Sequence, residues 1–487
     1  MNAIGFDNEK YLQIQSACIR ERIAKFDKLY LEFGGKLLDD NHASRVLPGF
    51  QPDSKFRMLE KLKDQAEIIF AIGADAIEQN KTRGDLGITY DADVIRLTQT
   101  FRDMGFYVSS VVITKYTGQA AADKFRQKLE ALNINTYLHY VIDGYPSDVE
   151  KIVSEDGYGK NEFVRTTRPL VVVTAPGPGS GKMATCLSQM YHEHKRGVTA
   201  GYAKFETFPI WNLPLKHPVN LAYEAATVDL ADVNMIDPFH LEAYNETTVN
   251  YNRDIEIFPV LNAMFELILG QSPYKSPTDM GVNMAGNCII DDDVCREASR
   301  QEIIRRYLDG ACGYKKGDLD KDYVQKLEVL MKQAGVTPEG RGVLRAADTL
   351  QTETGHPCAA IELPDGRIRT GRTNDLLGAA ASCLLNAMKD CAGIDHEIPL
   401  ISREAIEPIQ ALKTRYLGSK NPRLHSDEML IALSASAASN ENAALALEQL
   451  PKLRGCEAHS SVILSAVDES VYRRLGLRLT CSPAFGS

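Results

Sequence analysis

An apolar segment that stops abruptly at a glycine-rich turn constrains the fold of this chain more than any other feature. Residues 170–174 are Leu-Val-Val-Val-Thr, the turn Ala-Pro-Gly-Pro-Gly-Ser-Gly follows, and a helical pattern runs from Lys182 to Lys195, with Gly197 beyond it. A short apolar run before such a turn predicts a buried strand, and Gly197 is a normal helix stop. A second strand-like run, residues 198–205, follows at once. The segment therefore predicts a βαβ unit, which belongs in an α/β fold with a parallel sheet flanked by helices.

The glycine turn also has the parts of a phosphate site. Backbone N–H groups beside glycines, the positive end of the next helix and one lysine together form a cradle for an anion. The same parts make up the phosphate loop of nucleotide-binding enzymes. A tight strand–helix turn without a ligand is the alternative. The residues predicted to hold a cofactor are Gly177, Gly179, Ser180, Gly181, Lys182 and Thr185.

Two positions of the turn depart from the phosphate-loop motif. Pro176 stands where the motif begins with glycine, and Met183 replaces the Ser or Thr whose hydroxyl holds Mg²⁺. Thr185, one turn further into the helix, could replace that hydroxyl only if the loop is shifted. A dinucleotide fingerprint is a weaker alternative, because the glycines lack its spacing and Glu206 meets its acidic position only loosely. The turn predicts phosphate binding and leaves the need for Mg²⁺ open.

A lysine at the end of the next predicted strand is the second candidate for chemistry. The string Ala-Gly-Tyr-Ala-Lys at 200–204 resembles the second strand of dethiobiotin-synthetase-like phosphate-loop enzymes, where a lysine at that strand end reaches the phosphates or the substrate. The resemblance implies that Lys204 lies at the carboxyl end of the strand next to the loop, where ligands bind in open α/β sheets. A surface lysine is the alternative. Lys182 and Lys204 are therefore the predicted catalytic residues.

Composition and charge exclude several classes of protein. The chain has 487 residues, 44% of them hydrophobic, and a net charge of −10, which is typical of a soluble globular protein with more than one domain. It has no long Lys/Arg-rich run, so we expect no nucleic-acid partner and no membrane partner. We expect a cytoplasmic location, because the sequence has neither a signal peptide nor an apolar stretch of about 18 residues. Its ten cysteines include no Cys-x-x-Cys pair, so we predict reduced thiols and no metal site.

The pattern of strand-like, helix-like and polar segments divides the sequence into three regions. Residues 1–165 alternate strand-like and helix-like segments and predict an α/β, Rossmann-like region. Residues 166–315 contain the phosphate-loop-like unit and a long polar stretch, and they end in a predicted linker from Gly310 to Gly317. Residues 318–487 predict an α+β domain with an alanine-rich helix at 428–450.

Longer strings along the whole chain, and not only the glycine turn, suggest a family. They include Glu-Phe-Gly-Gly-Lys-Leu (32–37), Arg-Val-Leu-Pro-Gly-Phe (45–50), Arg-Gly-Asp-Leu-Gly-Ile-Thr-Tyr-Asp (83–91) and the strings at 175–185, 204–214 and 276–283. Together they resemble an uncharacterised bacterial family, known only as the domain-of-unknown-function 1846 family. The resemblance implies a cytosolic bacterial protein of unassigned activity, and it brings no catalytic residue to carry over. Met183 belongs to one of these strings, so the departure from the phosphate-loop motif is intrinsic to the family-like sequence.

The function that these features predict is enzymatic. We expect a phosphorylated small molecule as the partner and ATP or another nucleotide as the cofactor. The expected reaction is ATP-dependent phosphoryl transfer or ligation, in which Lys204 neutralises the developing charge. A phosphometabolite-binding protein without turnover is one alternative, and a metal-free phosphosugar transferase or isomerase is another. The sequence leaves the substrate and the formation of a homo-oligomer open.

Overall fold

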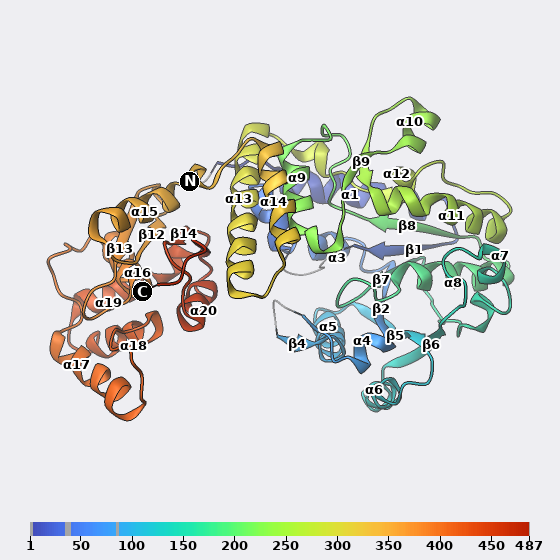
Figure 1. Cartoon of the computed structure of the whole chain (residues 1–487). Helices are drawn as coiled ribbons and strands as arrows, with labels where there is room; N and C mark the ends of the chain where they lie inside the picture. The colour runs from blue at the N-terminus through green and yellow to red at the C-terminus, as the bar shows by residue number, and fades with distance from the viewer. Residues whose placement is uncertain (1–2, 35–39, 84–86, 487) are drawn as a thin grey trace. The chain divides into compact units, whose positions relative to one another are not determined.

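The computed structural model describes residues 3–34, 40–83 and 87–486. The chain divides into two compact units (Figure 1), of which the first is Ile4–Ala298 and the second is Ser299–Ser487 together with the N-terminal end. Helix α13 (Asp292–Lys316) carries the chain from the first unit into the second.

A parallel sheet forms the centre of the first unit. Within the described residues it has seven strands, and every neighbouring pair is parallel. Strands β1, β2 and β7 are buried along almost their whole length, as expected for a sheet with both faces covered. This confirms the predicted parallel sheet flanked by helices. The spatial order is β11 (Gly281–Val282), β8 (Ala200–Phe205), β1 (Lys28–Phe33), β7 (Leu170–Thr174), β2 (Ala66–Gly73), β5 (Tyr107–Tyr116) and β6 (Asn135–Tyr140).

Helices and two short strand pairs surround this sheet. The helices are α1 (Asn8–Ile23), α2 (Asn41–Val46), α3 (Ser54–Glu60), α4 (Ala74–Glu78), α5 (Tyr90–Asp103), α6 (Ala120–Ala131), α7 (Val149–Ile152), α8 (Lys182–Lys195), α9 (Pro218–Ala226), α10 (Pro238–Tyr244), α11 (Asn252–Leu269) and α12 (Pro277–Met280). The antiparallel pairs are β3 (Thr82–Arg83) with β4 (Ile88–Thr89) and β9 (Asn234–Ile236) with β10 (Val249–Tyr251).

Both faces of the sheet are covered. Helices α8 and α11 share a hydrophobic cluster with alternate residues of the central strands, among them Tyr30, Val171 and Tyr202. Successive strand residues point to opposite faces, and the intervening Leu29 and Leu31 are also fully buried. Because all the strands are parallel, their carboxyl ends meet at one edge, toward which the arrows of β1 and β8 point in Figure 1.

In the predicted βαβ unit, β7 and α8 have their expected bounds and β8 begins two residues later than expected, but another strand lies between the two. Strands β7 and β8 are parallel and joined by α8, yet β1 lies between them and pairs with both. The expectation that β8 is the strand next to the loop strand is therefore wrong. The sheet contains strands from both of the first two predicted regions, residues 1–165 and 166–315. Pairing with β1 joins segments more than a hundred residues apart, and a local pattern does not encode it.

The long polar stretch after β8 contains a helix that the sequence analysis did not predict. Helix α11 has 18 residues and contains Pro259. A proline removes one backbone donor from a helix interior and usually kinks the helix. Its presence makes the helical spacing of the apolar residues around it harder to recognise in the sequence. The side chains that the helix buries nevertheless recur at helical spacing: Ile255, Phe258, Leu261, Phe265 and Ile268.

The second unit has a sheet of its own. Its described residues form the strand order β13 (Ile368–Arg372), β12 (Cys358–Glu362), β14 (Glu457–Ser460) and β15 (Arg478–Cys481). Only the pair of β14 and β15 is parallel in this described sheet. A separate C-terminal sheet domain is thereby confirmed. The helices that follow α13 are α14 (Lys321–Ala334), α15 (Gly342–Thr354), α16 (Ala379–Ala392), α17 (Arg403–Ala411), α18 (Ser426–Ser436), α19 (Glu441–Leu447) and α20 (Ala466–Arg474).

Two sequence expectations about the C-terminal half are wrong. The expected linker from Gly310 to Gly317 is the end of helix α13, which continues to Lys316. Its glycines permit close packing, since a Cβ on Gly313 would lie 2.7 Å from the Leu319 side chain. The helix expected at 428–450 is two helices, because the Asn440 side chain accepts hydrogen bonds from the first N–H groups of α19 and starts a new helix.

Candidate functional site

The glycine turn joins the end of β7 to the start of α8 at the carboxyl edge of the sheet. Gly181 is the N-cap of α8, with a φ of +81° that glycine adopts without strain. Among the described residues no side chain caps this helix, so its first N–H groups have no side-chain acceptor. Lys182 is half-buried, and no carboxylate in the described part of the chain pairs with it. The turn thus brings backbone donors and an unpaired lysine together.

Each of the three glycines in the turn has different surroundings, which decide whether a side chain would fit there. A Cβ on Gly177 would overlap the hydroxyl of Tyr90, the first residue of α5. A Cβ on Gly181 would lie 2.9 Å from the Thr114 hydroxyl of β5. Gly179 has a φ of +73°, and no atom of the described residues lies within 4 Å of its would-be Cβ. Packing therefore explains two glycines, while the third borders open space.

The two hydroxyl groups that the sequence assigns to the site both bond to the turn itself. The Ser180 hydroxyl donates to the Gly177 carbonyl oxygen at 2.9 Å, and Ser180 is buried. The Thr185 hydroxyl donates to the Gly181 carbonyl oxygen, also at 2.9 Å, and Thr185 is fully buried. These bonds hold the turn against the start of α8. A ligand contact of either hydroxyl stays a prediction.

Lys204 lies at the same edge but is held by carboxylates. Its register partner in β1 is Glu32, which is in turn the partner of Val173 in β7. Two strand spacings place the Lys204 backbone about 10 Å from that of Val173. The Lys204 ammonium lies 2.7 Å from a Glu206 oxygen and also pairs with Asp254 of α11. Its positive charge is thus already balanced within the protein.

Burial and charge set the protonation of this cluster. Burial acts to lower the pKa of Lys204, but the charges of Asp254 and Glu206 outweigh it and raise that pKa above its usual range. Lys204 therefore stays charged. Burial, with the Asp254 charge, raises the pKa of Glu206 to about 8 despite the attraction of Lys204. A carboxyl that titrates near neutral pH at a strand end has the property expected of a general acid or base.

Glu32 connects the cluster to the glycine turn. It is buried and accepts a 2.7 Å hydrogen bond from the Tyr202 hydroxyl. Burial raises the pKa of the Cys186 thiol in α8, and the charges of Glu32 and Lys182 act on that pKa in opposite directions. The charges of Glu32 and Lys182 thus both act on the same buried thiol. The lysine of the turn and the carboxylates of β1 and β8 share one edge of the sheet.

Sequence reasoning found part of this cluster and missed its partners. Glu206 lies two residues after Lys204, a spacing that puts both side chains on one face of a strand, and this signal was available. Asp254 lies 50 positions from Lys204 and reaches it only through α11, so no local pattern predicts it. Tyr90 and Thr114 approach the turn from α5 and β5 and were missed for the same reason.

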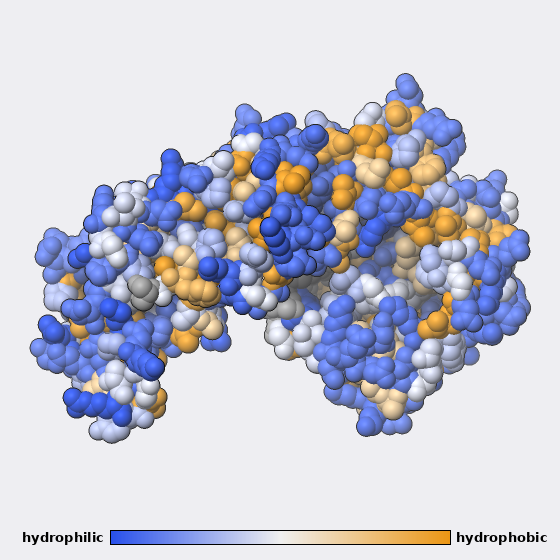
Figure 2. All heavy atoms as spheres, viewed as in Figure 1, coloured by the Kyte–Doolittle hydropathy of each residue, from blue (hydrophilic) through white to orange (hydrophobic). Residues whose placement is uncertain are grey.

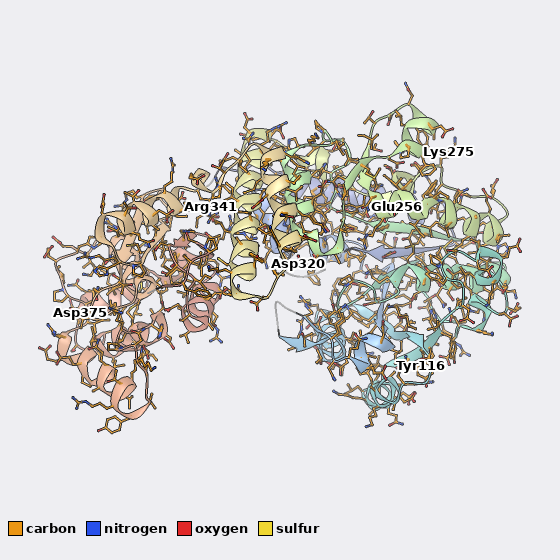
Figure 3. All side chains as sticks on the ribbon, viewed as in Figure 1. Tyr116, Glu256, Lys275, Asp320, Arg341 and Asp375 are labelled. Carbon is orange, nitrogen blue, oxygen red and sulfur yellow. The ribbon has the colours of Figure 1, made fainter. Side chains whose placement is uncertain are left out.

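Two surface cavities lie elsewhere in the described part of the chain, and neither is lined by the residues of the glycine turn or by Lys204 and its partners. One of about 760 Å³ lies beside α10 and α11 in the first unit and is lined by Phe239, Phe258 and Lys275, among others. Figure 2 shows hydrophobic side chains gathered over these helices. Figure 3 labels Lys275, which lines the cavity, and Glu256, which belongs to α11. Another, of about 510 Å³, lies between α15 and β13 in the second unit.

Comparison with known proteins shows which family the chain belongs to. Residues 4–335 match the family described as "Domain of unknown function DUF1846, N-terminal", and residues 339–487 match its C-terminal counterpart. The chain belongs to the DUF1846 family. It is 57% identical to a UPF0371 protein of Streptococcus thermophilus over 486 residues, and 58% identical to one of Corynebacterium diphtheriae over 487 residues. Each match covers 100% of this chain and 98% of the relative.

The family match confirms the resemblance on which the sequence strings agree, and it does not identify a reaction. Residues 35–37 and 84–86 of those strings lie outside the described residues. In the described ranges no helix has the length and apolar character needed to cross a bilayer. Within the same ranges, His, Cys, Asp and Glu side chains form no group of three or more that could hold a metal ion.

Proposed function

We propose that the glycine turn binds the phosphate groups of a nucleotide, and that the protein is an enzyme that transfers or uses a phosphoryl group. The observation that carries this proposal is the uncapped start of α8, where Gly181 is followed by the unpaired Lys182. The first turn of a 14-residue helix offers several N–H donors and a positive dipole end. The open space at Gly179 leaves room for a ligand in front of the turn.

The residues of the proposed site are the backbone of Gly179 and Gly181 and the side chain of Lys182. Ser180 and Thr185 support the turn through their hydrogen bonds to it. Lys204 is not used as a phosphate ligand here, because two carboxylates already offset its charge. The Glu206 carboxyl that pairs with Lys204 lies at the same edge of the sheet, where a titratable group suits proton transfer.

Calorimetric titration of the full chain tests the binding. ATP, GTP, ADP and inorganic phosphate are titrated with and without Mg²⁺. We expect binding of at least one nucleotide and a loss of about tenfold or more in affinity for Lys182→Ala, since a hydrogen bond to a charged group contributes about 1.5–3 kcal/mol. Absence of nucleotide binding would contradict the proposal.

Lys195 provides the matched control for this titration. It lies at the opposite end of the same helix, where it pairs with Glu155. Lys195→Ala removes the same charge from α8 without touching the turn, and we expect it to leave the affinity unchanged. An equal loss in both variants would mean that overall charge, and not the turn, binds the anion.

A second candidate is a phosphometabolite-binding protein without turnover. Met183 favours it, because this side chain packs against the hydrophobic cluster of α8 and α11 and supplies no hydroxyl for Mg²⁺. The only hydroxyl one turn further on, that of Thr185, bonds to Gly181. Tight binding of a phosphorylated metabolite with no product detected by mass spectrometry would favour this candidate over the enzyme.

A further inference from the structure

We propose that the cavity beside α10 and α11 binds a zwitterionic small molecule with a large apolar body, the chemistry that apolar amino acids and short apolar peptides share. The inference does not depend on the proposed function, because none of the residues that line this cavity belongs to the glycine turn. All of them belong to the first unit. The rings, the anchored wall and the two charges of the cavity carry the inference.

Aromatic rings form the apolar surface of the cavity. The ring centroids of Phe239 in α10 and Phe258 in α11 lie 4.9 Å apart, with an interplanar angle of 54°. Phe258 is 4% exposed and belongs to the hydrophobic cluster under these helices, against which Phe239 packs. The volume of about 760 Å³ lies within the usual range for small-molecule sites. An apolar body of one or two rings therefore fits against a supported aromatic surface.

The segment that follows α11 forms another wall of the cavity and is anchored to the sheet. Gly270 ends the helix with a φ of +80°, which glycine adopts without strain and which turns the chain out of the helix. The Ser272 hydroxyl donates to the Tyr274 carbonyl oxygen at 3.0 Å and accepts from the Tyr274 N–H at 3.2 Å. The Tyr274 hydroxyl donates to the Tyr202 carbonyl oxygen of β8. Such preorganisation lowers the cost of binding a ligand.

Lys275 supplies the positive charge of the cavity lining. Its ammonium lies 5.5 Å from the centroid of the Tyr244 ring, and among the described residues no carboxylate pairs with it. The Asp279 carboxylate accepts the Lys275 backbone N–H at 2.9 Å and the Tyr244 hydroxyl at 2.8 Å. Asp279 thereby holds the lysine and the ring beside each other. An unpaired ammonium close to aromatic rings suits a ligand that joins a carboxylate to an apolar body.

The last turns of α11 supply negative charge. Glu266 lines the cavity, is exposed, and accepts a 2.9 Å hydrogen bond from the side-chain amide of Asn262. Asn262 is a neutral donor, so the charge of the carboxylate remains. The carbonyl end of a helix carries partial negative charge as well, and α11 ends at Leu269, directly before the lining residue Gly270. An ammonium group of a ligand is therefore favoured at this end of the helix.

The two charges together select the class of ligand. A carboxylic acid without an ammonium group leaves Glu266 unmatched, and an amine without a carboxylate leaves Lys275 unmatched. A zwitterion with an apolar body matches both charges and the rings of Phe239 and Phe258. Because Lys275 and Glu266 are exposed, each ionic contact contributes modestly, and the apolar surface supplies the rest of the affinity.

Calorimetric titration of the full chain with matched compounds tests the inference. Phenylalanine and the dipeptide phenylalanyl-phenylalanine carry both charges and an apolar body. Hydrocinnamate lacks the ammonium group, phenylalaninamide lacks the carboxylate, and serine lacks the apolar body. We expect saturable binding of at least one of the two zwitterions, with an affinity about fivefold or more above that of each partial analogue. The tighter of the two zwitterions distinguishes an amino-acid site from a peptide site.

Two variants of exposed side chains assign each charge. Lys275→Ala should weaken binding of the zwitterion and of hydrocinnamate about fivefold and leave phenylalaninamide unchanged. Glu266→Gln should weaken binding of the zwitterion and of phenylalaninamide and leave hydrocinnamate unchanged. The matched controls are Lys128→Ala in the last turn of α6 and Glu256→Gln in α11, both exposed and outside the cavity lining. Neither control should change any of these affinities.

The outcomes that overturn this inference are separate from those that overturn the proposed function. Absence of saturable binding of both zwitterions contradicts it, as does binding of serine or hydrocinnamate as tight as that of the zwitterions. Unchanged affinity for the zwitterion in Lys275→Ala and Glu266→Gln, or an equal loss in the controls, also contradicts it. Each of these results leaves nucleotide binding at the glycine turn intact, and a failure of nucleotide binding leaves the cavity proposal intact.

Discussion

The Thr114 hydroxyl donates a 2.8 Å hydrogen bond to the Ser180 carbonyl oxygen. Thr114 is a buried residue of β5, two strands away from β7 in the sheet. The glycine turn therefore extends across the end of β2 and is anchored on its far side. This contact holds the turn in place from β5, and preorganisation of this kind lowers the cost of binding.

Thr114→Val is expected to loosen the glycine turn. Valine has the shape of threonine but no hydroxyl, so the Ser180 carbonyl oxygen loses its donor at a cost of about 1 kcal/mol. Affinity for the nucleotide found by calorimetry should fall by about fivefold, which matches that cost. Thr136→Val on the neighbouring β6 is the control, because among the described residues the Thr136 hydroxyl bonds only to the Ile134 carbonyl oxygen, two positions back. An unchanged affinity in Thr114→Val would show that the anchor does not shape the site.

Alanine at Gly177 and at Gly179 should have different effects. The Cβ of Gly177→Ala would overlap the Tyr90 side chain, and we expect a loss of about 2–3 kcal/mol in the free energy of unfolding from this overpacking. Gly179→Ala meets open space, so only the cost of its positive φ remains, about 1 kcal/mol. Thermal or urea unfolding measures both. Equal effects of the two substitutions would contradict the contact with Tyr90.

The sequence contained enough to predict the local elements of the site but not its assembly. The bounds of β7 and α8 follow from an apolar run, a glycine turn and a helical pattern, all of which are local. The insertion of β1 between β7 and β8 is set by pairing between distant segments. The same limit applies to Asp254, because its contact with Lys204 depends on how α11 crosses the sheet. The sequence shows the charges of Lys182 and Lys204 and the nearby Glu206, but not that α11 brings Asp254 to Lys204.

Gly313→Ala in helix α13 is expected to destabilise the second unit, although alanine usually stabilises a helix. A glycine inside a helix costs about 1 kcal/mol relative to alanine, so the substitution would help in an exposed helix. Here the new methyl group would lie 2.7 Å from the Leu319 side chain, and displacing it costs about 1–3 kcal/mol. A net loss in the unfolding free energy checks this. A net gain would mean that the close approach of Leu319 relaxes freely.

His425 and Asp468 are expected to make the stability of the second unit depend on pH. The His425 ring nitrogen Nδ1 lies 2.8 Å from an Asp468 oxygen, and this hydrogen bond raises the pKa of His425. Burial alone would raise the pKa of Asp468, but hydrogen bonds from His425 and Ser426 outweigh it and lower that pKa. The contribution of His425 is complete below its unfolded pKa, about 6.5, and that of Asp468 is complete above its unfolded pKa, about 3.9.

The pair should therefore stabilise the helix starts of α18 and α20 most between about pH 4 and about pH 6.5. As the pH rises through the raised pKa of His425, its contribution is lost, and as the pH falls through the lowered pKa of Asp468, the other contribution is lost. His425→Gln should cost about 1 kcal/mol near pH 5.5 and much less near pH 8.5. Hydrogen exchange of peptides from α18 and α20 measures this locally in the full chain. A cost of His425→Gln that is the same at both pH values would show that the imidazole acts there without its charge.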